Sequence, residues 1–389
     1  MRVLMLVATS LASDTRVLRE AVTLARAGHA VHVIGKQVPA GWQPPDGVSA
    51  SSAGASSVFR AEGSPSLAGR RLSPPARVAR WLLLPTHRNS AFGRWAAAAG
   101  ADAAGRDFDV VHAHDFTALE VGADLAAARG VPLVYDSHEL WSGRPRIGRP
   151  TPLQARLEHA VEARLGGAAV AVITVGDGVA RALRAAYGWR HVTVVRNTFP
   201  LPDHVPVAPP HPVGAVYAGR LAPYRELEAI AGASRRLELP ITLVGPADET
   251  WLAGFDPGRA LVRAPLPVDD VDALLTGAGL ALVTHSDRWA NHRLAMPNKL
   301  FHAVRAGVPV VATDVGELGA LVREHGVGEL YRPGDAVDLA RAVEAACAGY
   351  PRLVAAVRAA APALSWERDA AALLGVYERL PVPRATPGT

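Results

Sequence analysis

The sequence predicts an α/β protein made of two doubly wound parallel-sheet domains that face a cleft. Its 389 residues exceed what one ordinary hydrophobic core accommodates. Short Val- and Ile-rich runs recur along the chain and are nearly continuous rather than alternating, which is typical of parallel strands covered on both faces. A proline-rich stretch at 199–212 separates two series of such runs and is typical of an extended linker.

The first domain, residues 1–200, is expected to contain six strands with helices between them. The first ten residues superficially resemble a signal peptide, but an amphipathic helix from Val17 to Ala27 and a second apolar run follow at once, which favours a strand–helix–strand unit. The stretch Pro39–Pro85 fits the pattern poorly and is interpreted as an elaborated loop with a helix at the mouth of the cleft. The expected strands are Val3–Ala8, Ala30–Ile34, Val110–His112, Leu133–Tyr135, Ala169–Val175 and His191–Arg196.

The second domain, residues 213–365, repeats this pattern. Near its end, Pro297 is expected to open a helix that stops at Gly307, because proline suits the first turn of a helix and glycine tolerates a positive φ. Ligands of open parallel sheets bind at the carboxyl ends of the strands, so we expect the site there. The expected strands are Val213–Ala218, Ile241–Val244, Leu261–Arg263, Leu280–Thr284 and Val308–Ala312.

Composition excludes several classes of protein. The net charge is only +5, with no basic stripe interleaved with aromatic residues, so no nucleic-acid partner is expected. The single cysteine, Cys347, excludes an internal disulfide and a cysteine-rich metal site, and suits a reducing cytoplasm. No apolar run approaches the length that spans a bilayer. The expected location is therefore cytoplasmic.

The start of the helix after Pro297 is predicted to bind an anion. Free backbone N–H groups and the positive end of the helix dipole favour negative charge there, and Lys299 adds a full positive charge. Only two of the 41 basic residues are lysines, which argues that this one is not background composition. Arg220 and Arg225 follow the first strand of this domain and can converge on the same point, where a diphosphate supplies the matching charge. An ordinary capped helix with a solvated lysine is the alternative.

Polar residues also follow three strands of the first domain. The loop after the first strand lacks the glycines of a dinucleotide fingerprint, so no Rossmann cofactor is expected. The spacing of His112 and His114 suggests a metal, but no further Cys or compact ligand set supports one, and at least one of them is expected in the core. Asp270 and Asp272 are interpreted as helix-capping residues rather than as metal ligands. The candidates at these strand ends are Ser10, Asp14, His114, Asp115, His138, Glu139 and Trp141.

Taken together, the chain resembles the retaining, nucleotide-sugar-dependent glycosyltransferases of family 4, which have the GT-B fold. The resemblance covers nearly the whole chain. It is carried by Asp14–Ala21, Ala27–Val31, Asp109–Asp115, Tyr135–Trp141, Ile173–Val175, Val195–Asn197, Gly219–Leu221, Pro297–Val311 and Ser365–Arg368.

This resemblance implies roles for particular residues. His138 matches the active-site histidine near the reacting sugar, and Arg220 and Arg225 match the basic pair on the donor diphosphate. Asn298 and Lys299 match the phosphate-facing turn. The resemblance also implies an acceptor-binding first domain, a last helix (366–380) that packs back onto it, and neither a metal nor a cofactor besides the co-substrate.

The chain departs from the family where two glutamates usually face the donor sugar and the ribose. Leu294 and His302 stand there instead. His302 can still hydrogen-bond a ribose hydroxyl, while Asn291 or His292 can substitute for the first glutamate. The departure indicates either an uncommon donor sugar or lost activity.

The leading hypothesis is retaining transfer from a UDP-, GDP- or dTDP-sugar to a small natural-product or metabolite acceptor, or to a glycan. A nucleotide-sugar epimerase and a catalytically silent nucleotide-sugar-binding protein are the alternatives.

The residues expected on the acceptor side of the cleft are Ser10, Asp14, His114, Asp115, Glu139 and Trp141. The basic, apolar segment Arg70–Arg94 either lines an acceptor pocket, rests on the inner face of an anionic membrane, or is a solvated surface helix. The protein is expected to be a monomer or a homodimer.

Overall fold

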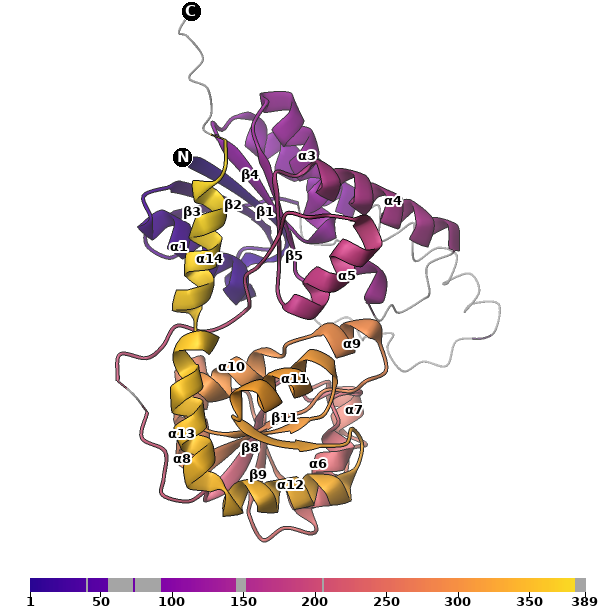
Figure 1. Cartoon of the computed structure of the whole chain (residues 1–389). Helices are drawn as coiled ribbons and strands as arrows, with labels where there is room; N and C mark the ends of the chain where they lie inside the picture. The colour runs from indigo at the N-terminus through magenta and orange to yellow at the C-terminus, as the bar shows by residue number, and fades with distance from the viewer. Residues whose placement is uncertain (40, 55–72, 74–91, 145–151, 205, 382–389) are drawn as a thin grey trace, which may run out of the picture. The chain divides into compact units, whose positions relative to one another are not determined.

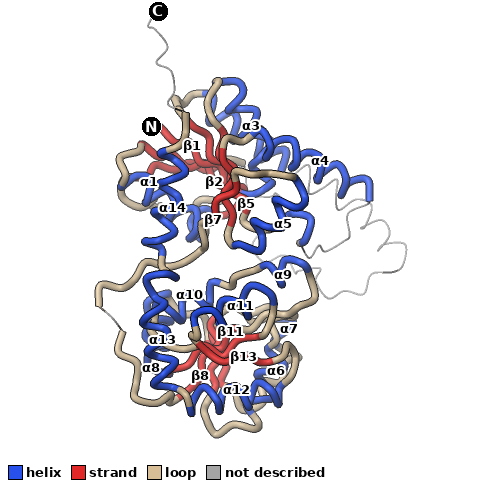
Figure 2. The backbone as a smooth tube through the Cα atoms, in the orientation of Figure 1, coloured by secondary structure: helices blue, strands red, loops and turns tan. Residues whose placement is uncertain are grey.

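The computed structural model describes residues 1–381 except 40, 55–72, 74–91, 145–151 and 205. It contains two compact units (Figure 1). The first comprises Met1–Val175, Ala180–Val195 and the chain from Ala370. The second comprises Gly176–Val179 and Arg196–Asp369. In both, the strands lie between helices (Figure 2).

The first unit is built on a seven-stranded sheet in which all pairs are parallel, in the order β3-β2-β1-β4-β5-β6-β7. Every residue of β4 and β5 is buried, as expected for strands covered on both faces. The chain order reverses between β1 and β4, which makes their carboxyl ends a topological switch point. The strands are β1 Arg2–Ser10, β2 Ala30–Lys36, β3 Val48–Ser52, β4 Val110–His114, β5 Leu133–Ser137, β6 Ala171–Thr174 and β7 Val192–Val194.

Helices connect these strands. The side chain of Asp14 caps the first of them by accepting a hydrogen bond from the Val17 backbone N–H. The last helix returns to this unit near its end, where the Tyr377 hydroxyl lies 2.9 Å from Nδ1 of His112. The helices are α1 Thr15–Arg26, an unlabelled helix at 92–104, α3 Asp115–Arg129, α4 Pro152–Ala168, α5 Asp177–Tyr187 and α14 Trp366–Glu378, with short 3-10 turns at Leu11–Ser13 and Trp141–Gly143.

One prediction for this unit was wrong. The loop assigned to Pro39–Pro85 contains strand β3, which pairs with β2 at the edge of the sheet. Its sequence, Val-Ser-Ala-Ser-Ser, is polar because an edge strand is only partly covered, and it therefore looks like a loop. Of Arg70–Arg94, only residues 73 and 92–94 are described, so the acceptor-pocket and membrane predictions for this segment fall outside the described residues.

The second unit contains a six-stranded parallel sheet in the order β10-β9-β8-β11-β12-β13. Its chain order reverses between β8 and β11. The edge strand β13 was not predicted, because its short Gly-Glu-Leu-Tyr sequence has no continuous apolar run. The strands are β8 Gly214–Ala218, β9 Ile241–Val244, β10 Leu261–Arg263, β11 Gly279–Val283, β12 Val310–Thr313 and β13 Gly328–Tyr331.

The predicted helix after Pro297 is present as α10, Asn298–Arg305. Pro297 occupies its N-cap position, one residue before the helix, rather than its first turn. Gly307 follows with φ +71, as a helix stop requires, and β12 comes next. The other helices are α6 Leu227–Ser234, α7 Glu249–Leu252, α8 Val268–Ala278, α9 Ala290–Leu294, α11 Gly316–His325, α12 Ala336–Ala348 and α13 Tyr350–Ala360, with a 3-10 turn at Ala361–Leu364.

Gly245 permits a close approach of two loops at the carboxyl edge of this second sheet. It adopts φ +145, and a Cβ there would lie 2.1 Å from the Gly219 carbonyl oxygen. Gly245→Ala is therefore expected to destabilise the protein by more than about 1 kcal/mol in urea unfolding. Gly277→Ala is the matched control, because a Cβ there meets nothing within 4 Å and alanine favours the helix. Equal effects of the two substitutions would contradict this explanation.

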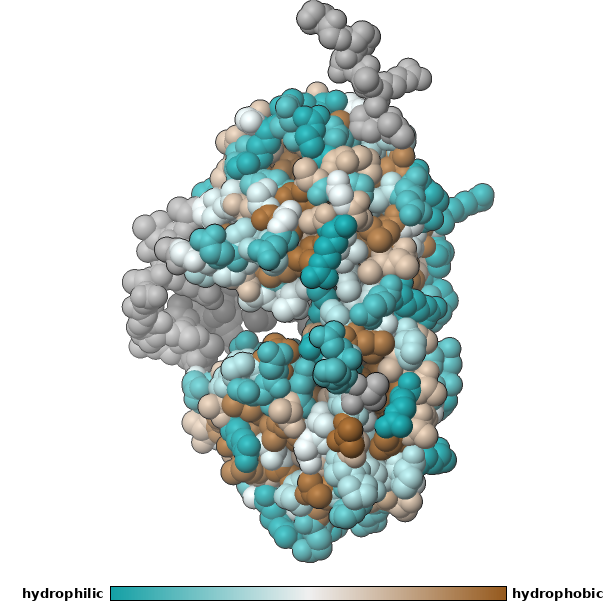
Figure 3. Space-filling model, turned by 90° about the vertical axis from the view of Figure 1, so that its left-hand side faces the viewer, coloured by the Kyte–Doolittle hydropathy of each residue, from teal (hydrophilic) through white to brown (hydrophobic). Residues whose placement is uncertain are grey.

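None of the described helices is long and apolar enough to cross a bilayer. On the face that Figure 3 shows, hydrophobic side chains form separate small groups among hydrophilic ones.

Candidate active site

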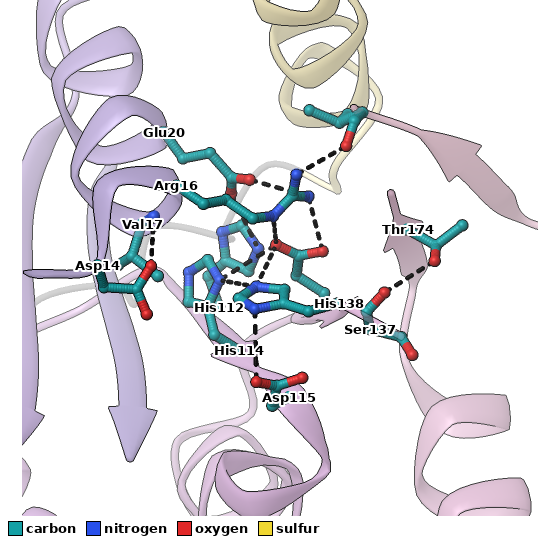
Figure 4. Close-up of polar contacts among 12 residues, drawn as sticks. Asp14, Arg16, Val17, Glu20, His112, His114, Asp115, Ser137, His138 and Thr174 are labelled. Atoms are coloured by element: carbon teal, nitrogen blue, oxygen red, sulfur yellow. Dashed lines mark hydrogen bonds and ion pairs between the residues drawn. The ribbon is translucent and has the colours of Figure 1, made fainter. Parts of the chain in front are cut away.

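Candidate residues of the first unit gather at its switch point (Figure 4). Asp14 follows β1, His114 ends β4, Asp115 begins α3, and His138 follows β5 directly. Because β1, β4 and β5 are neighbours in the sheet, their carboxyl ends bring these residues together. Asp115 has φ +63, a left-handed conformation that is uncommon for residues other than glycine.

Asp136, on β5, is the centre of a buried polar network. It accepts two hydrogen bonds from Arg16, at 3.0 and 2.9 Å, and its Oδ2 lies 3.2 Å from Nδ1 of His114. Nε2 of His138 lies 3.1 Å from the same oxygen, while Nδ1 of His138 lies 3.4 Å from Asp115. His138 is thus held between two carboxylates.

Arg16 connects this network to the rest of the unit. Its guanidinium contacts Glu20 at 3.0 Å and donates to the Val195 carbonyl at 2.8 Å. Arg16, Glu20 and Asp136 were not among the site residues predicted from the sequence. The available signals were the i,i+4 spacing of Arg16 and Glu20 on α1, and an acidic residue near the end of a buried strand.

The charges of these groups follow from their neighbours. Burial opposes ionisation of Asp136, but Arg16 and His138 outweigh it and hold its pKa well below the usual range. Burial also opposes protonation of His138, but Asp115 and Asp136 raise the pKa of His138 to about 9. His138 is therefore an imidazolium at neutral pH, and can act as a hydrogen-bond donor or a positive charge rather than as a general base.

Four buried side chains of this unit could hold a metal: ligand atoms of Glu20, His112, His114 and Asp136 lie within 4.8 Å of one another. The guanidinium of Arg16 contacts both acidic residues of this set and supplies the positive charge for Asp136, while burial raises the pKa of Glu20 to about 8. The arrangement favours an internal ionic network, and the absence of a metal stays a prediction. His112 lies in the core and meets Tyr377, as one of the two histidines was expected to do.

The other candidates of the first unit have local partners. Ser10 donates to the Gln37 carbonyl at 3.4 Å. Asp14 accepts from Thr9 in addition to capping α1. Glu139 pairs with Arg144 at 2.8 Å. Trp141 donates to Glu158 of α4 at 2.8 Å and stacks on Phe116.

In the second unit, Lys299 lies beside the switch point between β8 and β11. Its Nζ is 5.1 Å from the centre of the Tyr217 ring on β8. A Cβ on Gly219 would lie 3.0 Å from the lysine Cε, so glycine leaves room for the side chain. Burial, together with the nearby Arg225, lowers the pKa of Lys299 to about 8. Two positive groups therefore share this strand end, as expected for an anion site.

Other predicted donor residues lie in different environments. Arg220 and Asn298 are exposed, Asn291 is buried on α9, and Nδ1 of His292 lies 2.6 Å from the Ser286 hydroxyl.

His302 does not present a free ring. Its Nε2 contacts Asp272, and the ring stacks on Phe199 at 5.0 Å between centres. The capping interpretation of Asp272 was wrong: Asp270 lies in the first turn of α8, whereas Asp272 pairs with His302 and Arg305. The His302 ring is therefore engaged with Asp272 and Phe199. Its predicted hydrogen bond to a ribose hydroxyl stays a prediction.

Known glycosyltransferases match both units of the chain. A model of Glycosyltransferase Family 4 matches residues 14–201, and a model of Glycosyl transferases group 1 matches residues 213–348. The glycogen synthase of Mycobacterium tuberculosis is 27% identical over 304 residues, which is 71% of each chain.

Solved structures show the same fold. Sucrose-phosphate synthase of Thermosynechococcus elongatus has a TM-score of 0.70 at 17% identity, covering 97% of this chain and 99% of its own. HepE of Anabaena in complex with UDP-glucose has a TM-score of 0.69 at 16% identity, covering 98% of this chain and 100% of its own. The chain has the GT-B fold and belongs to the family 4 glycosyltransferases.

Proposed function

We propose that this glycosyltransferase moves a sugar from a nucleoside-diphosphate sugar to an acceptor with retention of the anomeric configuration, and without a metal. The proposal rests on Lys299 and Arg225, which lie at the switch point of the second sheet, next to the start of α10. Open α/β sheets bind ligands at this place, and two cations beside a helix N-terminus suit a diphosphate. The complex of the structural relative HepE with UDP-glucose supports a nucleotide sugar as the donor.

The hard step is departure of the diphosphate from an oxocarbenium-like centre. Lys299 and Arg225 stabilise the charge that develops on the leaving group. The acceptor then attacks from the face that the diphosphate leaves, and its proton passes to a phosphate oxygen. His138, as an imidazolium, orients a donor hydroxyl; its 3.4 Å contact with Asp115 is looser than its 3.1 Å contact with Asp136 and is the one that a substrate oxygen replaces.

A nucleotide-sugar-binding protein without turnover is the second candidate. Leu294 cannot hydrogen-bond a sugar hydroxyl, and His302 is engaged with Asp272. Incubation with UDP-, GDP- and dTDP-sugars, with and without a panel of acceptors, separates the candidates. Nucleotide release that requires an acceptor, with a product of retained configuration, is the result expected for transfer. Binding without turnover supports the second candidate, and an altered sugar without release supports an epimerase.

Lys299 gives nucleotide binding a defined pH dependence. An anion favours the protonated lysine, whose pKa in the free protein is about 8. Affinity for UDP is therefore expected to be constant below pH 8 and to fall by up to about tenfold per pH unit above it, as the lysine must take up a proton to bind. Lys299→Arg should remove this dependence, because arginine stays charged. Calorimetric titrations between pH 7 and pH 9.5, at about one-unit steps, measure both proteins; parallel curves would contradict the assignment.

A further inference from the structure

His285 belongs to the second unit and was not among the site residues predicted from the sequence. It lies two residues after the end of β11, at the same switch point as Lys299 and Arg225. Its backbone N–H donates to the Thr313 hydroxyl at 2.9 Å, which ties it to β12. The preceding residue, Thr284, donates to the Arg225 carbonyl at 2.6 Å. Hydrogen bonds to β12 and to the segment after β8 therefore hold His285 and the residue before it in place.

The His285 side chain has an unsatisfied polar atom. The residue is only 8% exposed, and its Nδ1 is buried with no hydrogen-bond partner among the described residues. The ring packs on His292, with 4.4 Å between centres. Buried polar atoms in native proteins are almost always hydrogen-bonded, so an unpaired nitrogen at a ligand-binding strand end indicates a contact that a ligand completes.

The charges around this ring define the ligand. Burial, followed by His292, Lys299 and Arg225, lowers the pKa of His285 to about 3, so the ring is neutral at physiological pH. A neutral imidazole carries one N–H, and the two charged groups that act on this ring, Lys299 and Arg225, are cations that cannot accept a hydrogen bond. The two cations, together with an Nδ1–H donor on His285, favour an anion as the ligand.

We propose that His285 is a donor-binding residue that donates a hydrogen bond from Nδ1 to a phosphate oxygen of the nucleotide sugar. This inference rests on the proposed function and adds a third side chain to the diphosphate site of Lys299 and Arg225.

The test compares His285→Asn, His285→Gln and His285→Ala. The side-chain amide of asparagine can place its nitrogen near the Nδ1 position, whereas that of glutamine reaches toward Nε2. The probe is whichever of UDP, GDP and dTDP the wild-type protein binds most tightly in calorimetry. The alanine and glutamine variants are expected to bind it about tenfold more weakly, and the asparagine variant within about threefold of wild type, as for the loss or retention of one hydrogen bond to a charged group.

Two controls complete the design. His325→Ala, at the end of α11, should leave affinity unchanged, and melting temperatures identify any variant that fails to fold. Unchanged affinity in His285→Ala, or retention by glutamine but not asparagine, overturns the inference. If Lys299→Ala still abolishes binding in that case, the proposed function survives without it. If no nucleoside diphosphate binds the wild-type protein, both fail.

Discussion

Replacing Lys299 by alanine is expected to lower sugar transfer by about 10²–10³-fold, the usual cost of removing one preorganised group that stabilises developing charge. Lys299 is half-buried beside Tyr217 and Arg225, so water cannot fully replace its charge. The loss should appear in kcat as well as in KM, because the leaving diphosphate carries more charge in the transition state than in the bound donor.

Lys36→Ala is the natural control for this variant, because Lys36 is the only other lysine of the chain and ends β2 in the first unit. It should keep wild-type turnover. The family resemblance predicts a severe loss for Arg220→Ala as well, although the side chain is exposed in this structure. Near-normal turnover of a folded Lys299→Ala protein would count heavily against the phosphate assignment.

The second large effect is expected from Asp136→Asn, which should lower the free energy of unfolding by about 3–5 kcal/mol. Asparagine keeps the shape of the side chain but removes the charge that Arg16 and His138 need. Arg16 is only 3% exposed and would remain in the core with Glu20 as its one acidic contact. Loss of Asp136 should also lower the pKa of His138, which NMR titration of its ring can measure.

An exposed pair of the same chemistry provides the comparison. Asp107 contacts Arg2 at 3.1 Å, but its side chain is 75% exposed. Asp107→Asn should therefore leave stability almost unchanged. Urea unfolding of both variants measures the difference, and similar small losses would show that the Asp136 network does not hold the first unit together.

Much of the fold could be predicted from local patterns in the sequence. Buried parallel strands such as β4 and β5 are continuous apolar runs because helices cover both faces, and α10 is marked by Pro297 and Gly307. The edge strands β3 and β13 escaped prediction because partial exposure allows polar residues in them. Periodicity reports burial, so it fails where a strand is not buried.

Candidate site residues could be proposed from the sequence where they stand at or just after the end of a buried strand, as His138 does after β5. Pairings between distant segments could not. Arg16 and Asp136 are 120 positions apart, and His302 meets Asp272 from another helix. The role proposed for His285 could not come from the sequence, because it depends on the buried, unpaired Nδ1 and the cationic neighbours that only the structure shows.

We propose that Lys299 and Arg225 hold the diphosphate of the donor. A crystal structure of the protein with bound UDP would show whether they do. The predicted result places the two phosphates against the Lys299 ammonium and the Arg225 guanidinium, at the start of α10. A well-ordered nucleotide bound elsewhere, with both side chains contacting only water, would contradict it.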